Sequence, residues 1–186
     1  MTSLLQINHG AYAGSKLKEI CSHEALSLHI KSMAEEISAD YEGEVPILIG
    51  ILNGCIHFFS DLALALTIDC EYTFMRISSY GDALESSGKH LVNGDLNTSI
   101  FGRHVIIVED IVDTGKTLQF LRTYLKGHEA KSIECAALFV KDENESADVK
   151  YRGMGLGDHF VVGYGLDLEQ QKRNLSSIYE LTPKAP

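Results

Sequence analysis

Two patterns of apolar residues alternate along the chain between residues 22 and 140. From Ser22 to Gly43, apolar side chains recur at steps of three and four, which predicts an amphipathic helix that ends at the glycine. Elsewhere, short continuous apolar runs are typical of strands that are covered on both faces of a parallel sheet. The predicted strands are 45–52, 72–77, 105–108, 133–140 and 160–162, and the other predicted helices are 58–66 and one from about 115. This alternation predicts an α/β fold with a mainly parallel central sheet flanked by helices.

The segments outside this alternation look like additions to one domain. A chain of 186 residues suits a single domain with a substantial core, and we expect that core at about 22–141. Residues 78–97 form a polar stretch with three glycines and no period. A stretch of this length inside a compact domain is either a functional lid or a disordered loop.

Composition and charge limit the classes of partner. Hydrophobic residues make up 45% of the chain and charged residues 23%, an ordinary balance for a globular protein. The formal net charge is −10 and no block of Lys or Arg stands out, so we expect no extended nucleic-acid surface. A local anion site is compatible with this charge, because backbone N–H groups bind phosphate without net positive charge.

Signals for targeting and for structural metals are not found in the pattern. The first residues show no basic start followed by an apolar run, and no apolar stretch approaches the ~18 residues that span a bilayer. We therefore expect a cytoplasmic protein that does not bind membranes. The 4 cysteines contain no CxxC pair and the 8 histidines form no HExxH pattern, so we interpret the cysteines as reduced packing residues.

The most informative stretch is 105–117, where four aliphatic residues run into two adjacent acids, Glu109 and Asp110. A short loop with a third acid, Asp113, then opens a helix. Ligands of open α/β sheets bind at the carboxyl ends of the strands, where this loop is expected. Backbone N–H groups up to Thr117, with Gly115 allowing close approach, form a phosphate cradle. The paired acids could hold sugar hydroxyls or a hydrated magnesium ion.

Two simpler interpretations compete for the same stretch. The triplet Gly115-Lys116-Thr117 invites comparison with P-loops, but that motif needs a glycine where Asp110 stands, so we reject it. Alternatively, Asp113 or Thr114 merely caps the helix. Because burying two adjacent acids at a strand end without a partner is costly, the whole pattern favours a functional role.

The segment from Val108 to Thr117 resembles the phosphoribosyl-pyrophosphate signature of type I phosphoribosyltransferases, and specifically their hypoxanthine/guanine branch. The resemblance runs from about Ile47 to Leu181. Four further segments match in the same order, at 50–55, 78–81, 138–141 and 158–167. The resemblance implies the fold of that family, in which a small hood built from the N-terminal segment and about 142–186 carries the base pocket.

The resemblance also implies a reaction in which a purine nitrogen replaces pyrophosphate at C1 of phosphoribosyl pyrophosphate, with Mg²⁺ neutralising the leaving group. It assigns the ribose hydroxyls and their magnesium to Glu109 and Asp110, a second magnesium to Asp167 through water, and the proton at purine N7 to Asp113. The residues that it assigns to the 5-phosphate are Asp113, Thr114, Gly115, Lys116 and Thr117. Those that it assigns to pyrophosphate are Leu52, Asn53, Gly54 and Arg173.

For the base, the resemblance implies contacts from the second half of the chain. Lys141 donates to the oxygen on purine C6, which favours 6-oxopurines such as hypoxanthine and guanine over adenine. Phe160 stacks on the base, and the carbonyl of Val161 faces its 2-position. Ser79 and Tyr80 belong to the polar segment, which closes as a lid to exclude water.

Four positions depart from the family pattern. Asn53 stands where the family often has Lys or Arg, and Cys55 stands where Gly or Ser is common. His159 replaces the Lys that usually precedes the stacking aromatic, and Gly157 replaces the Pro two positions before that Lys. The family's pyrophosphate loop relies mainly on backbone donors, often with a non-proline cis peptide, so Asn53 is compatible with binding.

Two other activities stay open at this point. One is a xanthine-preferring phosphoribosyltransferase. The other is a regulator that senses phosphoribosyl pyrophosphate and binds nucleic acid, which the acidic balance opposes. A homodimer or homotetramer is expected from the resemblance only.

Overall fold

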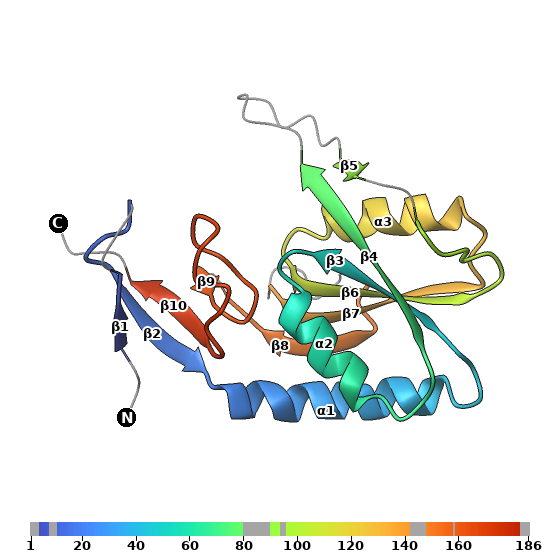
Figure 1. The fold of residues 1–186 in the computed structure, drawn as a ribbon, viewed down its shortest axis with the longest axis horizontal. Helices are drawn as coiled ribbons and strands as arrows, with labels where there is room; N and C mark the ends of the chain where they lie inside the picture. Colours follow the sequence, from blue (N-terminus) through green and yellow to red (C-terminus); the bar gives the residue numbers. More distant parts are fainter. Residues whose placement is uncertain are drawn as a thin grey trace.

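The computed structural model describes residues 4–7, 11–79, 90–93, 96–141, 148–157 and 159–182. Its larger sheet has six strands in the order β5-β4-β3-β6-β7-β8 (Figure 1). Strands β4, β3, β6, β7 and β8 run parallel to one another, whereas β5 pairs with β4 antiparallel. The strands are β3 (Ile47–Leu52), β4 (Glu71–Ser79), β5 (His90–Asn93), β6 (His104–Val112), β7 (Ser132–Val140) and β8 (Tyr151–Gly155). The predicted α/β fold with a mainly parallel sheet is confirmed.

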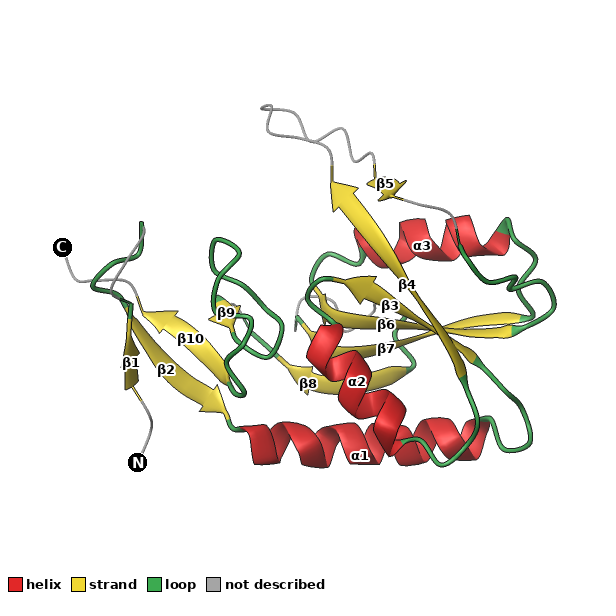
Figure 2. Cartoon of the chain, in the orientation of Figure 1, coloured by secondary structure: helices red, strands yellow, loops and turns green. Residues whose placement is uncertain are grey.

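Helices of the described chain cover both faces of this sheet (Figure 2). Helices α1 (His23–Asp40) and α2 (Ile56–Ala65) pack on one face, and α3 (Lys116–Lys126) packs on the other. The predicted stripe on α1 faces the core, and the side chain of Ser22 caps its start by accepting from the N–H of Ala25 at 3.3 Å. None of the described helices is long and apolar enough to cross a membrane.

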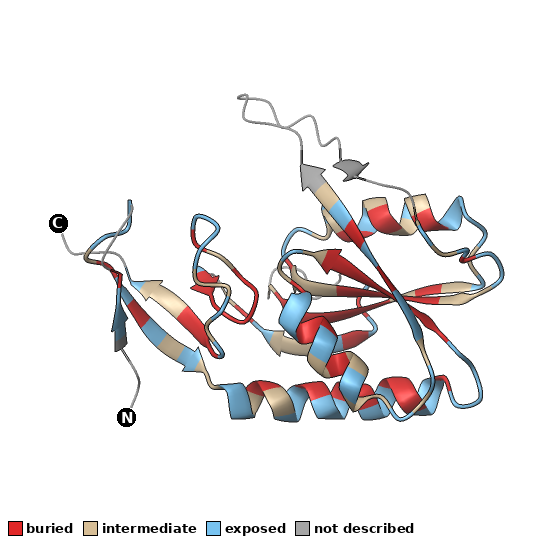
Figure 3. Cartoon of the chain, viewed as in Figure 1, coloured by how far each residue is buried: buried red, intermediate tan, exposed pale blue. Residues whose placement is uncertain are grey.

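Alternate residues of the central strands feed two separate apolar layers. Leu48 on β3 belongs to the layer under α1 and α2, whereas Ile47 and Ile49 belong to the layer under α3. Burial is therefore concentrated in the sheet and on the inward sides of the helices (Figure 3). Because both faces are covered, the strands read as continuous apolar runs, as the sequence predicts.

A second, smaller sheet is built from both ends of the chain, in the order β1-β2-β10-β9. All of its pairings are antiparallel. The strands are β1 (Leu4–Gln6), β2 (Lys16–Cys21), β9 (Val161–Val162) and β10 (Ile178–Thr182). Leu17, Val162 and Tyr179 lie in its own small core. This is the arrangement that the resemblance implies for a hood.

The sheet corrects two expectations about its limits. Strand β8 pairs with β7, so the central sheet extends past the boundary that the sequence suggests near residue 141. Its sequence, Tyr-Arg-Gly-Met-Gly, holds two glycines and little apolar periodicity, so the strand signal is weak. The polar stretch 78–97 is also not a single loop, because β5 within it pairs with β4.

Candidate active site

The two adjacent acids lie on β6, just past the point where its pairing with β3 ends. Pairing between β6 and β3 ends at Val108 opposite Gly50, whereas pairing between β6 and β7 continues to Val112. Glu109 and Asp110 occupy the step between these two ends. The strand thus runs four residues past the predicted end at Val108, and it carries the acids within it instead of after it.

The environment of these acids is unfavourable for negative charge. Burial, and then the neighbouring Asp110, raise the pKa of Glu109 well above its ordinary value. Burial also raises the pKa of Asp110, although the N–H of Ile111 donates to its Oδ1 at 2.8 Å. The Oε2 atom of Glu109 is buried and has no hydrogen-bond partner among the described residues. A buried carboxylate oxygen without a partner indicates a role in binding.

The loop after β6 forms a small pocket at the start of α3. The pocket has a volume of about 190 Å³ and is lined by Glu109, Asp113, Thr114, Gly115 and Thr117 together with Ile111, Val112 and Leu118. The first hydrogen bond of α3 runs from the N–H of Gln119 to the carbonyl of Gly115, so the first-turn N–H groups have no acceptor within the helix. These donors suit an anion.

The interpretation of Asp113 or Thr114 as a mere helix cap is wrong. The N-cap of α3 is Gly115, which has φ of +70° and makes no side-chain cap. The glycine is needed there because an L side chain rarely adopts that backbone conformation. Asp113 and Thr114 therefore lie before the cap and are exposed beside the pocket.

The pyrophosphate loop, defined here as Leu52, Asn53 and Gly54, lies against the same acids. The peptide bond between Leu52 and Asn53 is cis, as the resemblance implies. A Cβ atom at Gly54 would lie 1.5 Å from the Oδ2 of Asp110, so any larger residue there would displace the Asp110 carboxylate. A second pocket, of about 210 Å³, is lined by Leu52 and Gly54 with Glu109, Asp110, Thr117, Ile51 and Ile77. The loop and the signature therefore share one site.

Lys141 and Asp113 meet at the ends of neighbouring strands. The register places Val112 opposite Val140, so the residues that follow each strand end are side by side. The Nζ of Lys141 lies 3.3 Å from the Oδ1 of Asp113, and both side chains keep exposed surface. A carboxylate and an ammonium group are thus presented together at the carboxyl edge of the sheet.

Four further predicted residues, Phe160, Val161, Asp167 and Arg173, lie on the segment between residues 159 and 173. Phe160 is 55% exposed, and Val161 is buried in β9. Arg173 pairs with Asp167 at 2.6 Å and donates to the carbonyl of Gly165 at 2.7 Å. Asp167 is close enough to raise the pKa of Asp110, while Arg173 opposes that effect. This segment therefore faces the acids of β6.

Some predicted residues are not brought into the two pockets. Lys116 is the exposed first residue of α3, and neither pocket includes Phe160 or Val161. Ser79 ends β4, and Tyr80 lies outside the described residues. The amide of Asn53 accepts from Arg76, a residue that sequence reasoning missed because a lone arginine in a strand carries no signal.

The donor set fits a magnesium ion that is shared with substrate. Among the described residues, no three His, Cys, Asp or Glu side chains gather as a metal cage. Magnesium typically takes one or two carboxylates and fills its other positions with water and substrate phosphate oxygens. The unpaired Oε2 of Glu109, next to Asp110, offers such a carboxylate pair.

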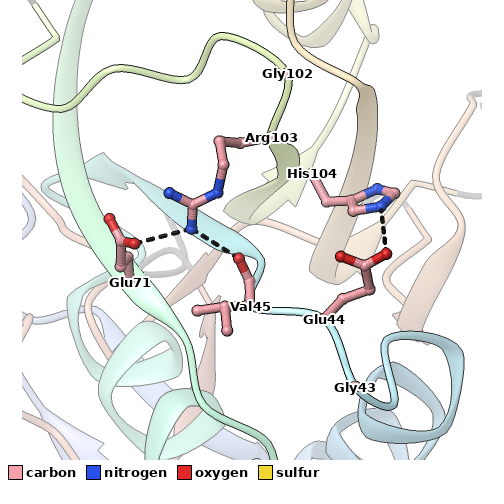
Figure 4. Close-up of a pocket in the computed structure, with 7 residues that line it drawn as sticks. All are labelled: Gly43, Glu44, Val45, Glu71, Gly102, Arg103 and His104. Carbon is pink, nitrogen blue, oxygen red and sulfur yellow. Dashed lines mark hydrogen bonds and ion pairs between the residues drawn. The ribbon is translucent and has the colours of Figure 1, made fainter.

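A further hollow lies at the opposite edge of the sheet, where the parallel strands begin (Figure 4). It measures about 400 Å³, but its charged groups are paired with one another. Arg103 donates to Glu71 at 2.8 Å and to the carbonyl of Val45 at 2.9 Å, and His104 lies 3.7 Å from Glu44. Since ligands of α/β sheets bind at the carboxyl edge, the candidate site is the one around Glu109.

Comparisons with known proteins agree on one family. A family model described as a phosphoribosyl transferase domain matches residues 16–169. The hypoxanthine-guanine phosphoribosyltransferase of Bacillus subtilis is 38% identical over 168 residues, which is 89% of this chain and 93% of that protein. The bifunctional protein TilS/HprT of Listeria innocua is 38% identical over 169 residues, and there the match spans only 26% of the longer protein.

A solved structure shows the same likeness. The hypoxanthine-guanine phosphoribosyltransferase of Bacillus anthracis, with a HEPES molecule in its active site, superposes with a TM-score of 0.83 at 36% identity. The superposition covers 88% of this chain and 98% of that one. The similarity therefore extends over most of this chain and nearly all of that one.

Proposed function

The chain belongs to the phosphoribosyl transferase family, and from that membership we propose that it makes IMP and GMP in purine salvage. It transfers the 5-phosphoribosyl group of phosphoribosyl pyrophosphate to hypoxanthine or guanine and releases pyrophosphate. The observation that carries the choice of base is the contact between Lys141 and Asp113, 3.3 Å apart.

One edge of a 6-oxopurine matches this pair. The ring nitrogen N7 and the oxygen on C6 are neighbours on that edge, whereas adenine carries an amino donor on C6. An ammonium donor beside a carboxylate can therefore hold the oxygen and the N7 position at once. The same ammonium would face the amino group of adenine with no acceptor, which disfavours adenine.

The two pockets suit the sugar and the phosphates. The N–H groups at the start of α3 and the hydroxyls of Thr114 and Thr117 are proposed to hold the 5-phosphate. Glu109 and Asp110 are proposed to hold the ribose hydroxyls, and the pyrophosphate loop with Arg173 is proposed to hold the leaving group. The close fit between Gly54 and Asp110 supports this assignment, because it brings the loop to the sugar site.

The chemistry is a substitution at C1 of the ribose. The bond from C1 to a pyrophosphate oxygen breaks and pyrophosphate leaves with the electron pair, while a purine nitrogen forms the new bond to C1. Magnesium would neutralise the pyrophosphate charge; Glu109 and Asp110 would hold one ion, and Asp167 would reach a second ion through water. Asp113 is proposed to take the proton at purine N7 as the base becomes bonded.

The cellular context is also part of the proposal. We place the protein in the cytoplasm and expect neither nucleic acid nor membrane as a partner, in line with its net charge of −10. A homodimer or homotetramer is supported by exposed aromatic surface on β4, where Tyr72 is 62% and Phe74 is 37% exposed. Light scattering after size-exclusion chromatography measures that state directly.

A spectrophotometric assay with each purine base tests the function. Hypoxanthine, guanine, xanthine and adenine are each supplied with phosphoribosyl pyrophosphate and magnesium. Conversion of hypoxanthine or guanine, with little conversion of adenine, is expected. A marked preference for xanthine would replace the proposed base, and efficient turnover of adenine alone would overturn the role of Lys141.

A further inference from the structure

Tyr164 is a buried side chain that the proposed chemistry does not use. It is 3% exposed and has φ of +49°, between two glycines that also have positive φ, Gly163 and Gly165. A residue other than glycine in this conformation carries an energetic cost, which its surroundings must offset. The contacts of the tyrosine therefore matter for the backbone on either side of it.

Those contacts join the segment between β9 and β10 to the helices of the core. The ring of Tyr164 lies 6.2 Å from that of His23 at the start of α1 and 5.7 Å from that of His57 near the start of α2. Its hydroxyl donates a hydrogen bond to the Oδ2 of Asp61 on α2. Burial, and then Asp61, raise the pKa of the Tyr164 phenol, so the phenol keeps the proton that it donates.

The backbone next to this tyrosine rests on the pyrophosphate loop. A Cβ atom at Gly165 would lie 2.0 Å from the carbonyl oxygen of Gly54, and one at Gly54 would lie 1.5 Å from Asp110. The backbone at Gly165 thus packs on Gly54 of the pyrophosphate loop, and Gly54 in turn packs on Asp110. Arg173 holds the same turn, because it donates to the carbonyl of Gly165 and pairs with Asp167.

The residues predicted to contact the base have a separate anchor. The N–H of Leu181 donates to the carbonyl of Phe160 at 3.0 Å, and Val161 pairs with Glu180 across the small sheet. His159 lies 2.6 Å from the carboxylate of Glu180. Strand β10 therefore holds the base-contacting strand, and Tyr164 takes no part in these contacts.

We propose that Tyr164 and Asp61 are positioning residues for the pyrophosphate half of the site. The inference rests on the proposed function, and it assigns to this pair the placement of Asp167 and Arg173 over the pyrophosphate loop. Loss of the hydrogen bond frees the turn at Gly165, which lets both charged side chains and the loop shift together. Small displacements of positioning groups weaken binding steeply, whereas the base contacts stay on β10.

The test compares Tyr164→Phe with a matched control. Tyr164→Phe removes the hydroxyl and keeps the ring. Tyr151→Phe removes a similar bond, from the hydroxyl of Tyr151 to the Oδ2 of Asp40 at 2.8 Å, which lies at the end of α1 away from the site. Asp61→Asn keeps an acceptor oxygen, and Asp61→Ala removes it. Each protein is assayed for melting temperature, for KM of both substrates, and for binding of inorganic pyrophosphate with Mg²⁺ by calorimetry.

Tyr164→Phe and Asp61→Ala are expected to raise the KM for phosphoribosyl pyrophosphate and the Kd for magnesium pyrophosphate about tenfold, the effect of one hydrogen bond to a charged group. The KM for the base should change far less, and Asp61→Asn should recover part of the loss. Equal effects of Tyr164→Phe and Tyr151→Phe on these constants would overturn the inference, as would unchanged constants in Tyr164→Phe. If the unmodified protein converts no purine, the proposed function fails, and the pyrophosphate affinities still decide the inference.

Discussion

The Nη2 of Arg76 donates to the Oδ1 of Asn53 at 3.1 Å. Strand register places Arg76 opposite Leu52, so the amide of Asn53 is turned towards β4. A positive charge therefore stands beside a pyrophosphate loop that carries none of its own. Because Arg76 engages the side-chain oxygen and turns the amide towards β4, we expect the backbone groups of the loop to make most of the contacts with pyrophosphate.

Replacing Asn53 tests this backbone account. Asn53→Ala is expected to raise the KM for phosphoribosyl pyrophosphate by no more than about fivefold, because an exposed hydrogen bond contributes about 1 kcal/mol or less. Asn53→Asp, which keeps the acceptor for Arg76, is the companion variant. A far larger rise in KM at unchanged kcat would show that the amide itself binds substrate.

Asp113→Asn tests proton transfer at purine N7. The variant keeps size but loses the ability to take a proton, so kcat should fall by ~10²–10⁴-fold. The melting temperature should stay near that of the unmodified protein, because Gly115 and not Asp113 caps α3. Glu35→Gln, which neutralises an exposed acid on α1, is the charge control. Single-turnover kinetics measure the chemical step itself, and a normal rate there would remove Asp113 from the mechanism.

Lys141→Gln tests the choice of base. The KM for hypoxanthine should rise by about tenfold or more, and the discrimination against adenine should narrow, because glutamine can also accept a bond from the amino group. Lys131→Gln is the control: it breaks the ion pair of Lys131 with Glu44, 3.0 Å apart at the opposite edge of the sheet. It should leave the KM for hypoxanthine and the discrimination against adenine unchanged. Similar kinetics in the two variants would contradict the assignment of Lys141.

Glu109→Gln tests how far the buried carboxyl group of Glu109 destabilises the folded protein near neutral pH. Burial raises the pKa of Glu109, so the folded protein binds this proton more readily than the unfolded chain does. The stability that this group contributes is full below its ordinary pKa near 4.5 and is lost as pH rises through the raised value. Glutamine cannot ionise, so the variant should melt a few degrees higher than the unmodified protein near neutral pH.

The gap between the two melting curves should close towards pH 4, where Glu109 itself is protonated. The measurement uses metal-free protein in chelator, because a bound cation would stabilise the carboxylate. The same variant should lose most of its activity, since the ribose and magnesium contacts proposed for Glu109 depend on its negative charge. Equal melting temperatures of the two proteins at every pH would mean that folding does not raise the pKa of Glu109.

The parts of the fold that sequence could predict are those with strong local signals. The stripe on α1, the apolar runs of β3 and β6, and the glycine before α3 each carry their own pattern over a few residues. The same holds for the acids of β6 and the cradle beside them. These groups are close in space because they are neighbours in the sequence, on one strand and the loop after it. Their proximity can therefore be predicted without any contact between distant parts of the chain.

The parts that sequence could not predict depend on partners far along the chain. The hydrogen bond between Tyr164 and Asp61 joins residues 103 positions apart, and nothing near either residue signals it. Strands β5 and β8 are short edge strands with polar or glycine-rich sequences, and they are defined by the strand beside them. The cap of α3 shows a second limit. Polar residues such as Asp113 or Thr114 are preferred as helix caps only statistically, and Gly115 is the cap in the structure.

The smaller sheet also sets an order of assembly. Leu17 on β2 pairs with Leu181 on β10, so the first ordered strands wait for nearly the last ones to be synthesised. The six-stranded sheet is complete by Gly155, and domains fold from the N-terminal side as the chain emerges. A nascent chain can thus build the loop at the start of α3 before β9 has any partner. A chain that stops before Ile178 would leave β2 and β9 as unpaired edges, which are sites of aggregation.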